Sequence, residues 1–200
     1  TSFIIHAILI IGSIGMLLPF AWMVLTAVKT RSQAISVNPF YFFPVDGWHF
    51  ENFATVWESY NFLILYKNTL LMILFRVALA CITATMAGYA FGRLKFPGKN
   101  AFFALILIQM MVPGQIFIIP QYLMISKLGM LNTQFALVFP GAVTAFGTYL
   151  LKQGYQTLPK ELEEAAEIDG CNVWMRFYKI MLPLTKSSMV SLGIFTALFA

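Results

Sequence analysis

The stretch LLMILFRVALACITATMAGYAF, residues 70–91, decides the fold of this chain. Its length falls within the roughly 17–25 residues that a helix needs to cross the hydrocarbon core of a bilayer. Only one of its side chains, that of Arg76, carries a charge. The stretch therefore predicts a membrane-spanning α-helix.

Similar apolar runs lie on both sides of this stretch. They cover Phe3–Val28, Ala101–Ile125 and Phe135–Leu151, and a fifth run opens near Met189. The whole chain is 60% hydrophobic and 10% charged, which excludes a soluble globular domain. We therefore predict an all-α fold, a polytopic transmembrane helix bundle with about five spans in these 200 residues.

The runs divide the chain into three regions. Residues 1–29 are predicted to form a first transmembrane helix, which is too long for a cleaved signal peptide. Residues 30–66 are predicted to form an extracytoplasmic segment with irregular or short-helical structure. Residues 67–200 are predicted to form the core domain. The chain starts at Thr1 without an initiator Met and stops at Ala200 within an apolar run, so we expect further segments at both ends. Cys81 and Cys171 lie in unlike settings, which predicts free thiols.

Basic residues predict the orientation of the spans, because cytoplasmic loops carry an excess of Lys and Arg. Eight basic residues fall on one side and four on the other, and the basic side includes the turn Arg93–Lys99 and the loop that follows residue 151. We assign that side to the cytoplasm. The basic residues lie at the ends of apolar runs and not in one patch, so nucleic acid is not predicted as a partner.

Small residues recur every four positions within the deciding stretch. A spacing of four places them on one side of a helix, where they let another backbone approach closely. We therefore predict a helix-packing seam, the alternative being chance spacing in a helix rich in alanine and glycine. The seam consists of Ala80, Ala84, Gly88 and Gly92.

Proline residues predict bends in the third and fourth spans. Pro113-Gly114 and Pro120 lie in the third, and Pro140-Gly141 in the fourth. Proline removes a backbone hydrogen bond, so the helix bends there. Bent helices suit the moving wall of a transport pathway, although they also occur in purely structural helices.

Three polar side chains lie at a depth where they could face a solute that carries hydroxyl groups: Gln109, Gln115 and Thr144. The alternative for each is a hydrogen bond between helices. Arg76 is an intramembrane charge, for which we expect either snorkelling toward the outer surface or pairing within a complex.

Several kinds of chemistry have no motif here. Gly98-Lys99 is followed by Asn100 and lacks the upstream glycine of a phosphate-binding loop, so we do not expect this chain to hydrolyse ATP. A zinc-binding helix, a serine nucleophile elbow and an intramembrane carboxylate pair are also absent, which predicts no catalytic residue and no metal site. The acidic residues lie in loops, which disfavours an ion-driven carrier. That carrier and a scaffold or sensor subunit remain the competing classes.

The most charged stretch, residues 158–183, is here called the docking element. Pro159 suits the first position of a short helix whose acidic first turn faces the positive end of the helix dipole. Gly170 can end that helix with a sharp turn, and Asn172 can cap a second helix that reaches about Ile180.

The second helix places Val173, Trp174, Phe177 and Tyr178 close together at helical spacing, as an aromatic face. Two short helices that meet at a glycine form a compact knob for a soluble partner. The alternative is a helix that rests on lipid headgroups, but the acidic residues of the first helix would be repelled from an anionic surface.

The docking element resembles the EAA loop of binding-protein-dependent ABC importer permeases. Seven positions match: Glu164-Ala165-Ala166, Gly170, Ile180 and Leu182-Pro183. Further phrases resemble the carbohydrate-uptake branch, in particular the second permease of the maltose transporter. They are Arg93–Gly98, Met111–Gln115, Ser126–Thr133 and Ile168–Gly170.

The resemblance implies a type I ABC importer permease fold with about six spans, in the cytoplasmic (inner) membrane of a bacterium or archaeon. It implies a heterodimer with a homologous second permease, two copies of an ATP-binding subunit and an extracytoplasmic solute-binding protein. ATP and magnesium would be bound by the partner ATPase, and this chain would hold no cofactor. The solute would be a sugar or oligosaccharide, with glycerol-phosphate or an acidic polysaccharide fragment as the alternatives within the family.

The resemblance also implies that the loop, at about residues 157–183, inserts into a groove of the ATPase and moves the attached spans. Short helices with a fitted surface would transmit that displacement. The coupling residues would be Glu164, Ala165, Ala166, Asp169, Gly170, Trp174, Phe177, Ile180, Leu182 and Pro183. Pro183 would mark the passage from the second docking helix into the fifth span.

Overall fold

The computed structural model describes residues 2–200, and these residues form helices and connecting turns without a strand. The predicted all-α fold is therefore confirmed. Two helices are long and apolar enough to cross a membrane by themselves, α1 (Ser2–Ala27) and α4 (Phe62–Arg93), and three bent pairs bring the number of candidate spans in the described residues to five. The chain divides into two compact units at Leu65, and each unit is described separately.

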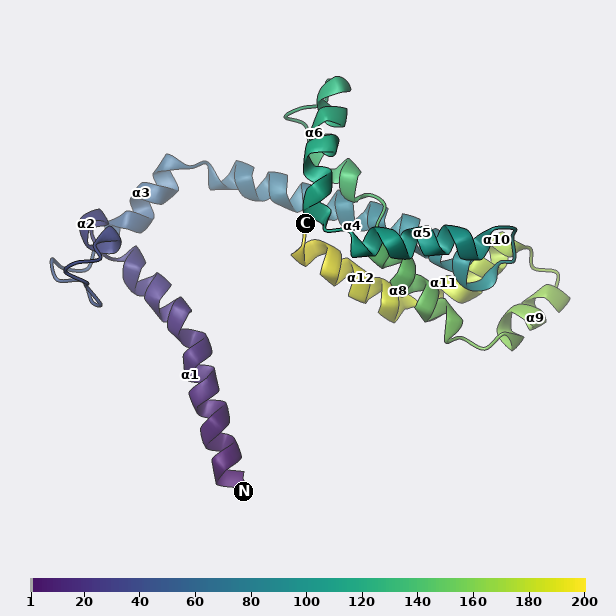
Figure 1. Cartoon of the computed structure of the whole chain (residues 1–200), viewed down its shortest axis with the longest axis horizontal. Coiled ribbons are helices and arrows are strands. Elements are labelled where there is room, and N and C mark those ends of the chain that lie inside the picture. The colour runs from purple at the N-terminus through teal and green to yellow at the C-terminus, as the bar shows by residue number, and fades with distance from the viewer. Residues whose placement is uncertain (1) are drawn as a thin grey trace. The chain divides into compact units, whose positions relative to one another are not determined.

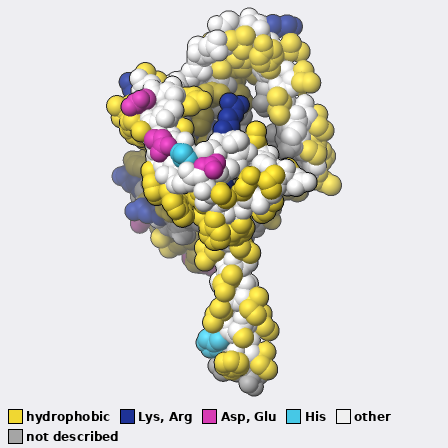
Figure 2. All heavy atoms as spheres, turned by 90° about the vertical axis from the view of Figure 1, so that its left-hand side faces the viewer, with side chains coloured by type: hydrophobic (Ala, Val, Ile, Leu, Met, Phe, Trp, Pro, Cys, Tyr) yellow, Lys and Arg dark blue, Asp and Glu magenta, His cyan; other side chains and the backbone are white. Residues whose placement is uncertain are grey.

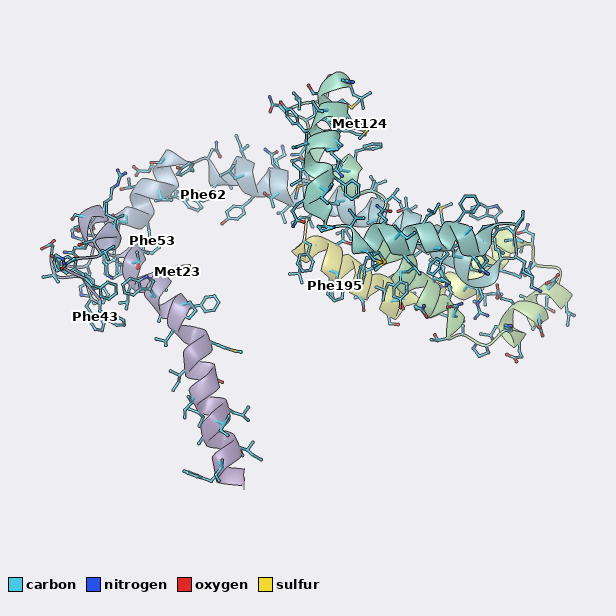
Figure 3. The ribbon with its side chains drawn as sticks, in the orientation of Figure 1. Met23, Phe43, Phe53, Phe62, Met124 and Phe195 are labelled. Atoms are coloured by element: carbon cyan, nitrogen blue, oxygen red, sulfur yellow. The ribbon has the colours of Figure 1, made fainter. Side chains whose placement is uncertain are left out.

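The first unit contains α1, α2 (Arg31–Ile35) and α3 (Glu51–Ser59). Hydrophobic side chains cover α1 along its length, as a lipid-facing or partner-facing helix requires (Figure 2). Lys29, two residues after the end of α1, is only 3% exposed. Its Nζ lies 4.0 Å from the centroid of the Trp22 ring and donates a hydrogen bond of 2.7 Å to the carbonyl of Tyr41. These contacts order the aromatic segment after α1, in which Figure 3 labels Phe43.

The second unit is a bundle in which α5 (Lys99–Met111) and α12 (Lys186–Leu198) both pack against α8 (Ala145–Gln156), as Figure 1 shows. The remaining elements of the unit are η1 (Gly114–Phe117), α6 (Ile118–Lys127), α7 (Gln134–Val138), η2 (Phe139–Gly141), α9 (Glu161–Ile168), α10 (Val173–Met175), the π-helix η3 (Arg176–Met181) and α11 (Leu182–Leu184). The buried core joins α4, α8, η3 and α12 and consists of Ala84, Tyr89, Leu151, Tyr155, Phe177, Met181 and Leu192.

The third and fourth candidate spans bend where proline predicted a bend. α5 and the helical segment that follows it meet at 97°, with Val112 extended before Pro113, as expected of a residue that precedes proline. The η2 segment with Pro140 meets α8 at 46°. Pro120, the other proline of the third span, lies in the first turn of α6, where a helix needs no N–H donor.

The fifth candidate span was predicted to begin at Pro183, and the structure places the break two residues later. The helix continues through Pro183 to Leu184, and the chain then turns by 73° at Thr185. The buried Thr185 hydroxyl donates to the carbonyls of Met181 and Leu182, both at 3.1 Å. Hydroxyls that bond back to the preceding turn bend helices, which accounts for the position of the break.

Candidate functional site

The first helix of the docking element is α9, and it ends in a tight turn at Gly170. The Gly170 N–H donates to the carbonyl of Glu167 at 3.0 Å, and the Cys171 N–H donates to that of Ala166 at 2.9 Å. These two bonds and a φ of 77° at Gly170 define a Schellman motif. Pro159 was predicted at the first helical position, but α9 starts at Glu161, so Pro159 lies in the turn before the helix.

The second helix is held to the first by polar contacts on both sides of the turn. Asn172 caps α10, as predicted, because its Oδ1 accepts from the N–H of Met175 at 2.9 Å. Arg176 of η3 forms an ion pair with Glu167 of α9. The turn, the cap and the ion pair fix the angle between α9 and the helix that follows.

The π-helix η3 anchors the docking element in the core of the bundle. Met181 is fully buried, and Phe177 is 8% exposed. The ring centroid of Phe177 lies 5.2 Å from that of Tyr89 on α4. The predicted aromatic face is therefore divided, because Phe177 packs inward whereas Trp174 remains 62% exposed. A π-turn widens the helix by one residue, and such turns are frequent at functional sites.

A buried polar cluster, here called the clamp, joins α9 to the end of α4. Tyr89 donates a hydrogen bond of 2.9 Å from its hydroxyl to Oε1 of Glu163, and the Nε of Arg93 lies 3.4 Å from Oε2 of the same carboxylate. Arg93 also donates to the carbonyl of Leu158, just before α9. The side chains of Arg93 and Glu163 are 6% and 15% exposed. The clamp therefore fixes α9 to α4 through a largely desolvated ion pair.

The outer surface of the docking element combines apolar and acidic groups. Ile168 is 86% exposed at the end of α9, next to the exposed Asp169 and close in sequence to Trp174. Figure 1 shows α9 and α10 at the same end of the second unit. Of the predicted coupling residues, six are exposed and four lie inward or half-buried. The exposed ones are Glu164, Ala165, Asp169, Gly170, Trp174 and Pro183; the others are Ala166, Phe177, Ile180 and Leu182.

Three of the four small residues of α4, namely Ala84, Gly88 and Gly92, lie where α4 meets α8. An ideal Cβ added to Gly88 would be 2.6 Å from the Cβ of Leu151 and 2.9 Å from the backbone N of Lys152. At Gly92 the Cβ of Tyr155 would be 3.2 Å away. Ala80 and Ala84 are buried. The glycines therefore permit an approach of α8 that a side chain would obstruct.

A cavity of about 670 Å³ lies at the other end of the bundle from the docking element, among α4, α5, η2, α8 and α12. Two of the predicted pathway residues, Gln109 and Thr144, line it, whereas Gln115 does not. Thr144 also caps α8, because its Oγ1 accepts from the N–H of Gly147 at 3.3 Å. Aromatic rings form part of the wall, among them Phe195, labelled in Figure 3 on α12.

Arg76 lines the same cavity. An ideal Cβ on Gly141 would be 2.2 Å from Nε of Arg76 and 2.7 Å from its Cζ, so the guanidinium lies directly over Gly141. Within residues 2–200, Nε is buried and has no hydrogen-bond partner. In the described chain Arg76 is therefore turned toward the bend of the fourth span.

Sequence reasoning missed the residues whose contacts are distant in the chain. Glu163 was counted only among the acidic residues in the first turn of the docking element's first helix. Arg93 served only to predict the orientation of the spans, and no role was predicted for Tyr89. The one available signal was that Arg93 and the acidic docking element were both assigned to the cytoplasmic side. Ile168 was not singled out, because a single isoleucine among charged residues is common on protein surfaces and predicts no contact by itself.

Comparison with known proteins places most of this bundle in one family. A family model described as "Binding-protein-dependent transport system inner membrane component" matches residues 84–200, which include the clamp and the docking element. The diacetylchitobiose uptake system permease protein NgcG of Streptomyces coelicolor is 29% identical over 195 residues, which cover 96% of this chain and 64% of that protein.

A putative ABC transporter permease protein of a Caldicellulosiruptor species is 34% identical over 185 residues, 90% of this chain and 66% of that protein. The sn-glycerol-3-phosphate transport system permease protein UgpE of Salmonella typhi is 32% identical over 97% of this chain and 70% of its own length. The chain thus spans slightly less than two thirds of the first two of these relatives.

Among solved structures, a bacterial ABC transporter involved in the import of the acidic polysaccharide alginate matches with a TM-score of 0.79. The match covers 98% of this chain and 69% of the other, at 24% sequence identity. The similarity shows that the two chains share a fold.

Proposed function

Because the chain belongs to the family of binding-protein-dependent transport system inner membrane components, we propose that it is a permease subunit of an ATP-driven importer. In this proposal the docking element binds a separate ATPase and transmits its movement to the spans. The observation that carries the proposal is the construction of that element. Its tip exposes Ile168 and Trp174 to a partner, while its base is fixed in the bundle through the clamp and Phe177.

The docking element can transmit force because its helices are fixed to the bundle by direct contacts and by continuous helical segments. The clamp ties α9 to α4, and η3 and α11 lead directly into α12. A displacement of the tip by the ATPase would therefore move α4 and α12 together. Both helices also contribute to the wall of the cavity, through Arg76 and Phe195. Movement at the ATPase would thus change the shape of the cavity, as alternating access requires.

The remaining parts of such an importer would be supplied by other chains. The family resemblance supports a homologous second permease, two ATP-binding subunits that hold ATP and magnesium, and an extracytoplasmic solute-binding protein. This chain would then have no catalytic role and no cofactor of its own. The apolar helices show a multi-pass membrane protein, and we assign it to the cytoplasmic (inner) membrane of a bacterium or archaeon.

The proposed solute is a sugar, an oligosaccharide or a related polyol. Relatives are named for diacetylchitobiose and for sn-glycerol 3-phosphate, and the protein of similar fold takes part in alginate import. The cavity has aromatic walls and the polar side chains of Gln109 and Thr144, which is the mixture of surfaces that binds hydroxylated ring compounds.

The proposal predicts transport driven by ATP and not by an ion gradient. The complete permease would be reconstituted in vesicles with its second permease, its ATPase and its solute-binding protein, and uptake of labelled sugars would be measured. We expect uptake with enclosed ATP and no uptake with a proton or sodium gradient alone. Uptake that requires the ion gradient and does not depend on ATP would identify an ion-driven carrier. Failure of the chain to purify with an ATPase would point to a scaffold or sensor.

A further inference from the structure

Arg76 is a charged side chain whose pairing is incomplete inside an apolar bundle. At 1.5 Å per residue it lies about 25 Å along α4 from Arg93, the predicted cytoplasmic end. That distance falls within a hydrocarbon core of about 30 Å, on the side from which a solute would enter. Among the described residues no carboxylate forms an ion pair with Arg76. Intramembrane charges that face a cavity mark functional sites.

The surroundings of Arg76 direct its charge into the cavity. Because Gly141 has no side chain, the guanidinium of Arg76 can occupy the space above it. The cavity wall adds the hydrogen-bonding groups of Gln109, Thr144 and Thr196, and none of the described residues that line it is acidic. The side chains of Phe146 and Phe195 meet edge to face, with ring centroids 5.7 Å apart, on the same wall.

We propose that this cavity binds a hydroxylated solute that carries an anionic oxygen group, a carboxylate or a phosphate, and that Arg76 binds that group. The inference rests on the proposed transport function and narrows its substrate class. A guanidinium holds both kinds of anion through two parallel hydrogen bonds, which a neutral hydroxyl cannot match. Gln109, Thr144 and Thr196 would bind hydroxyl groups, and the aromatic wall would contact the carbon skeleton.

The test compares pairs of probes that share a carbon skeleton, one of which carries an anionic oxygen group while the other is neutral. Binding of glucuronate against glucose, and of glycerol 3-phosphate against glycerol, is measured by equilibrium dialysis on the full-length permease pair in nanodiscs. We expect the anionic member of at least one pair to bind tighter by about tenfold or more, the effect of a hydrogen bond to a charged group. Equal binding of both members of each pair overturns the proposal.

Three variants assign the preference to Arg76. Arg76→Gln removes the charge and is expected to abolish the difference within each pair. Gly141→Ala keeps the charge but displaces the guanidinium, so we expect a similar loss even if Arg76→Gln fails to assemble. Lys67→Gln removes a charge elsewhere on α4 and should leave the preference unchanged. A preference that survives both Arg76→Gln and Gly141→Ala contradicts the assignment.

Two further results would separate this inference from its alternatives. Retention of phosphatidylglycerol from nanodiscs that depends on Arg76, without a preference among the soluble probes, would assign the site to a lipid headgroup and overturn the proposal. An assembled importer that takes up only neutral sugars with ATP would keep the proposed function and overturn the anionic substrate class.

Discussion

Replacing Gly170 by valine is expected to lower ATP-dependent uptake by about tenfold or more, because the left-handed conformation costs an L-residue roughly 1–2 kcal/mol and a β-branched one more. Gly170 has a φ of 77° and no neighbouring atom within 4 Å of an added Cβ. The effect therefore arises from the backbone and not from a clash. The strained turn would no longer hold α9 and α10 at a fixed angle, and the tip would not fit its partner. Uptake and ATP hydrolysis are measured in the same vesicles, and we expect hydrolysis to persist while uptake falls.

Two variants serve as controls for this result. Gly170→Asn should keep most of the uptake, since asparagine tolerates the left-handed region. Gly129→Val introduces the same strain in a second Schellman motif, at the end of α6. Gly129 has a φ of 67°, and an added Cβ would again have no neighbouring atom within 4 Å. Gly129 lies on the predicted outer side, so its valine variant should remain coupled. Normal uptake by Gly170→Val, or equal uncoupling by Gly129→Val, would contradict the role given to the turn.

Breaking the clamp is expected to have the second large effect. Glu163→Ala leaves Arg93 buried without its charged partner, and the loss of one member of a buried ion pair costs about 3–5 kcal/mol. We expect α9 to detach from α4, so that the ATPase still binds and hydrolyses ATP but uptake falls sharply. Hydrogen exchange of α9 should rise in the same variant, because its attachment to the bundle is lost.

A double-mutant cycle tests whether the ion pair itself is responsible. Arg93→Ala with Glu163→Ala should be less harmful than the sum of the two single changes, with a coupling energy of about 1–3 kcal/mol. Glu161→Ala removes an exposed acid two residues earlier on the same helix and provides the matched control. Additive effects of Arg93→Ala and Glu163→Ala, or uncoupling by Glu161→Ala, would exclude the clamp as the joint between α9 and α4.

Features set by neighbouring residues could be predicted from the sequence. The cap at Asn172, the turn at Gly170 and the bends at Pro113 and Pro140 each follow from the backbone chemistry of one or two residues. The spans follow from the length of apolar runs. The limits of the docking helices were less predictable, since Pro159 lies before its helix and Thr185 makes the break assigned to Pro183.

Features set by contacts between distant residues could not be predicted in the same way. Phe177 and Trp174 have the same aromatic character, and only the position of Tyr89 on α4 decides which of them is buried. The pairing of Arg93 with Glu163 and the position of Arg76 over Gly141 depend on how the helices pack. A single sequence carries no record of that packing.

The central claim is that the tip of the docking element contacts an ATPase, and site-directed cross-linking tests it most directly. Cys81 and Cys171 are first replaced by serine, and a single cysteine is then introduced by Ile168→Cys, at a position that is 86% exposed. In the assembled importer we predict that a short thiol-reactive cross-linker joins this position to the ATP-binding subunit, with a yield that changes when nucleotide is added. Leu131→Cys, on the predicted outer side, should give no such product. Absence of a cross-link from position 168 in an assembly that hydrolyses ATP and takes up solute would contradict the account.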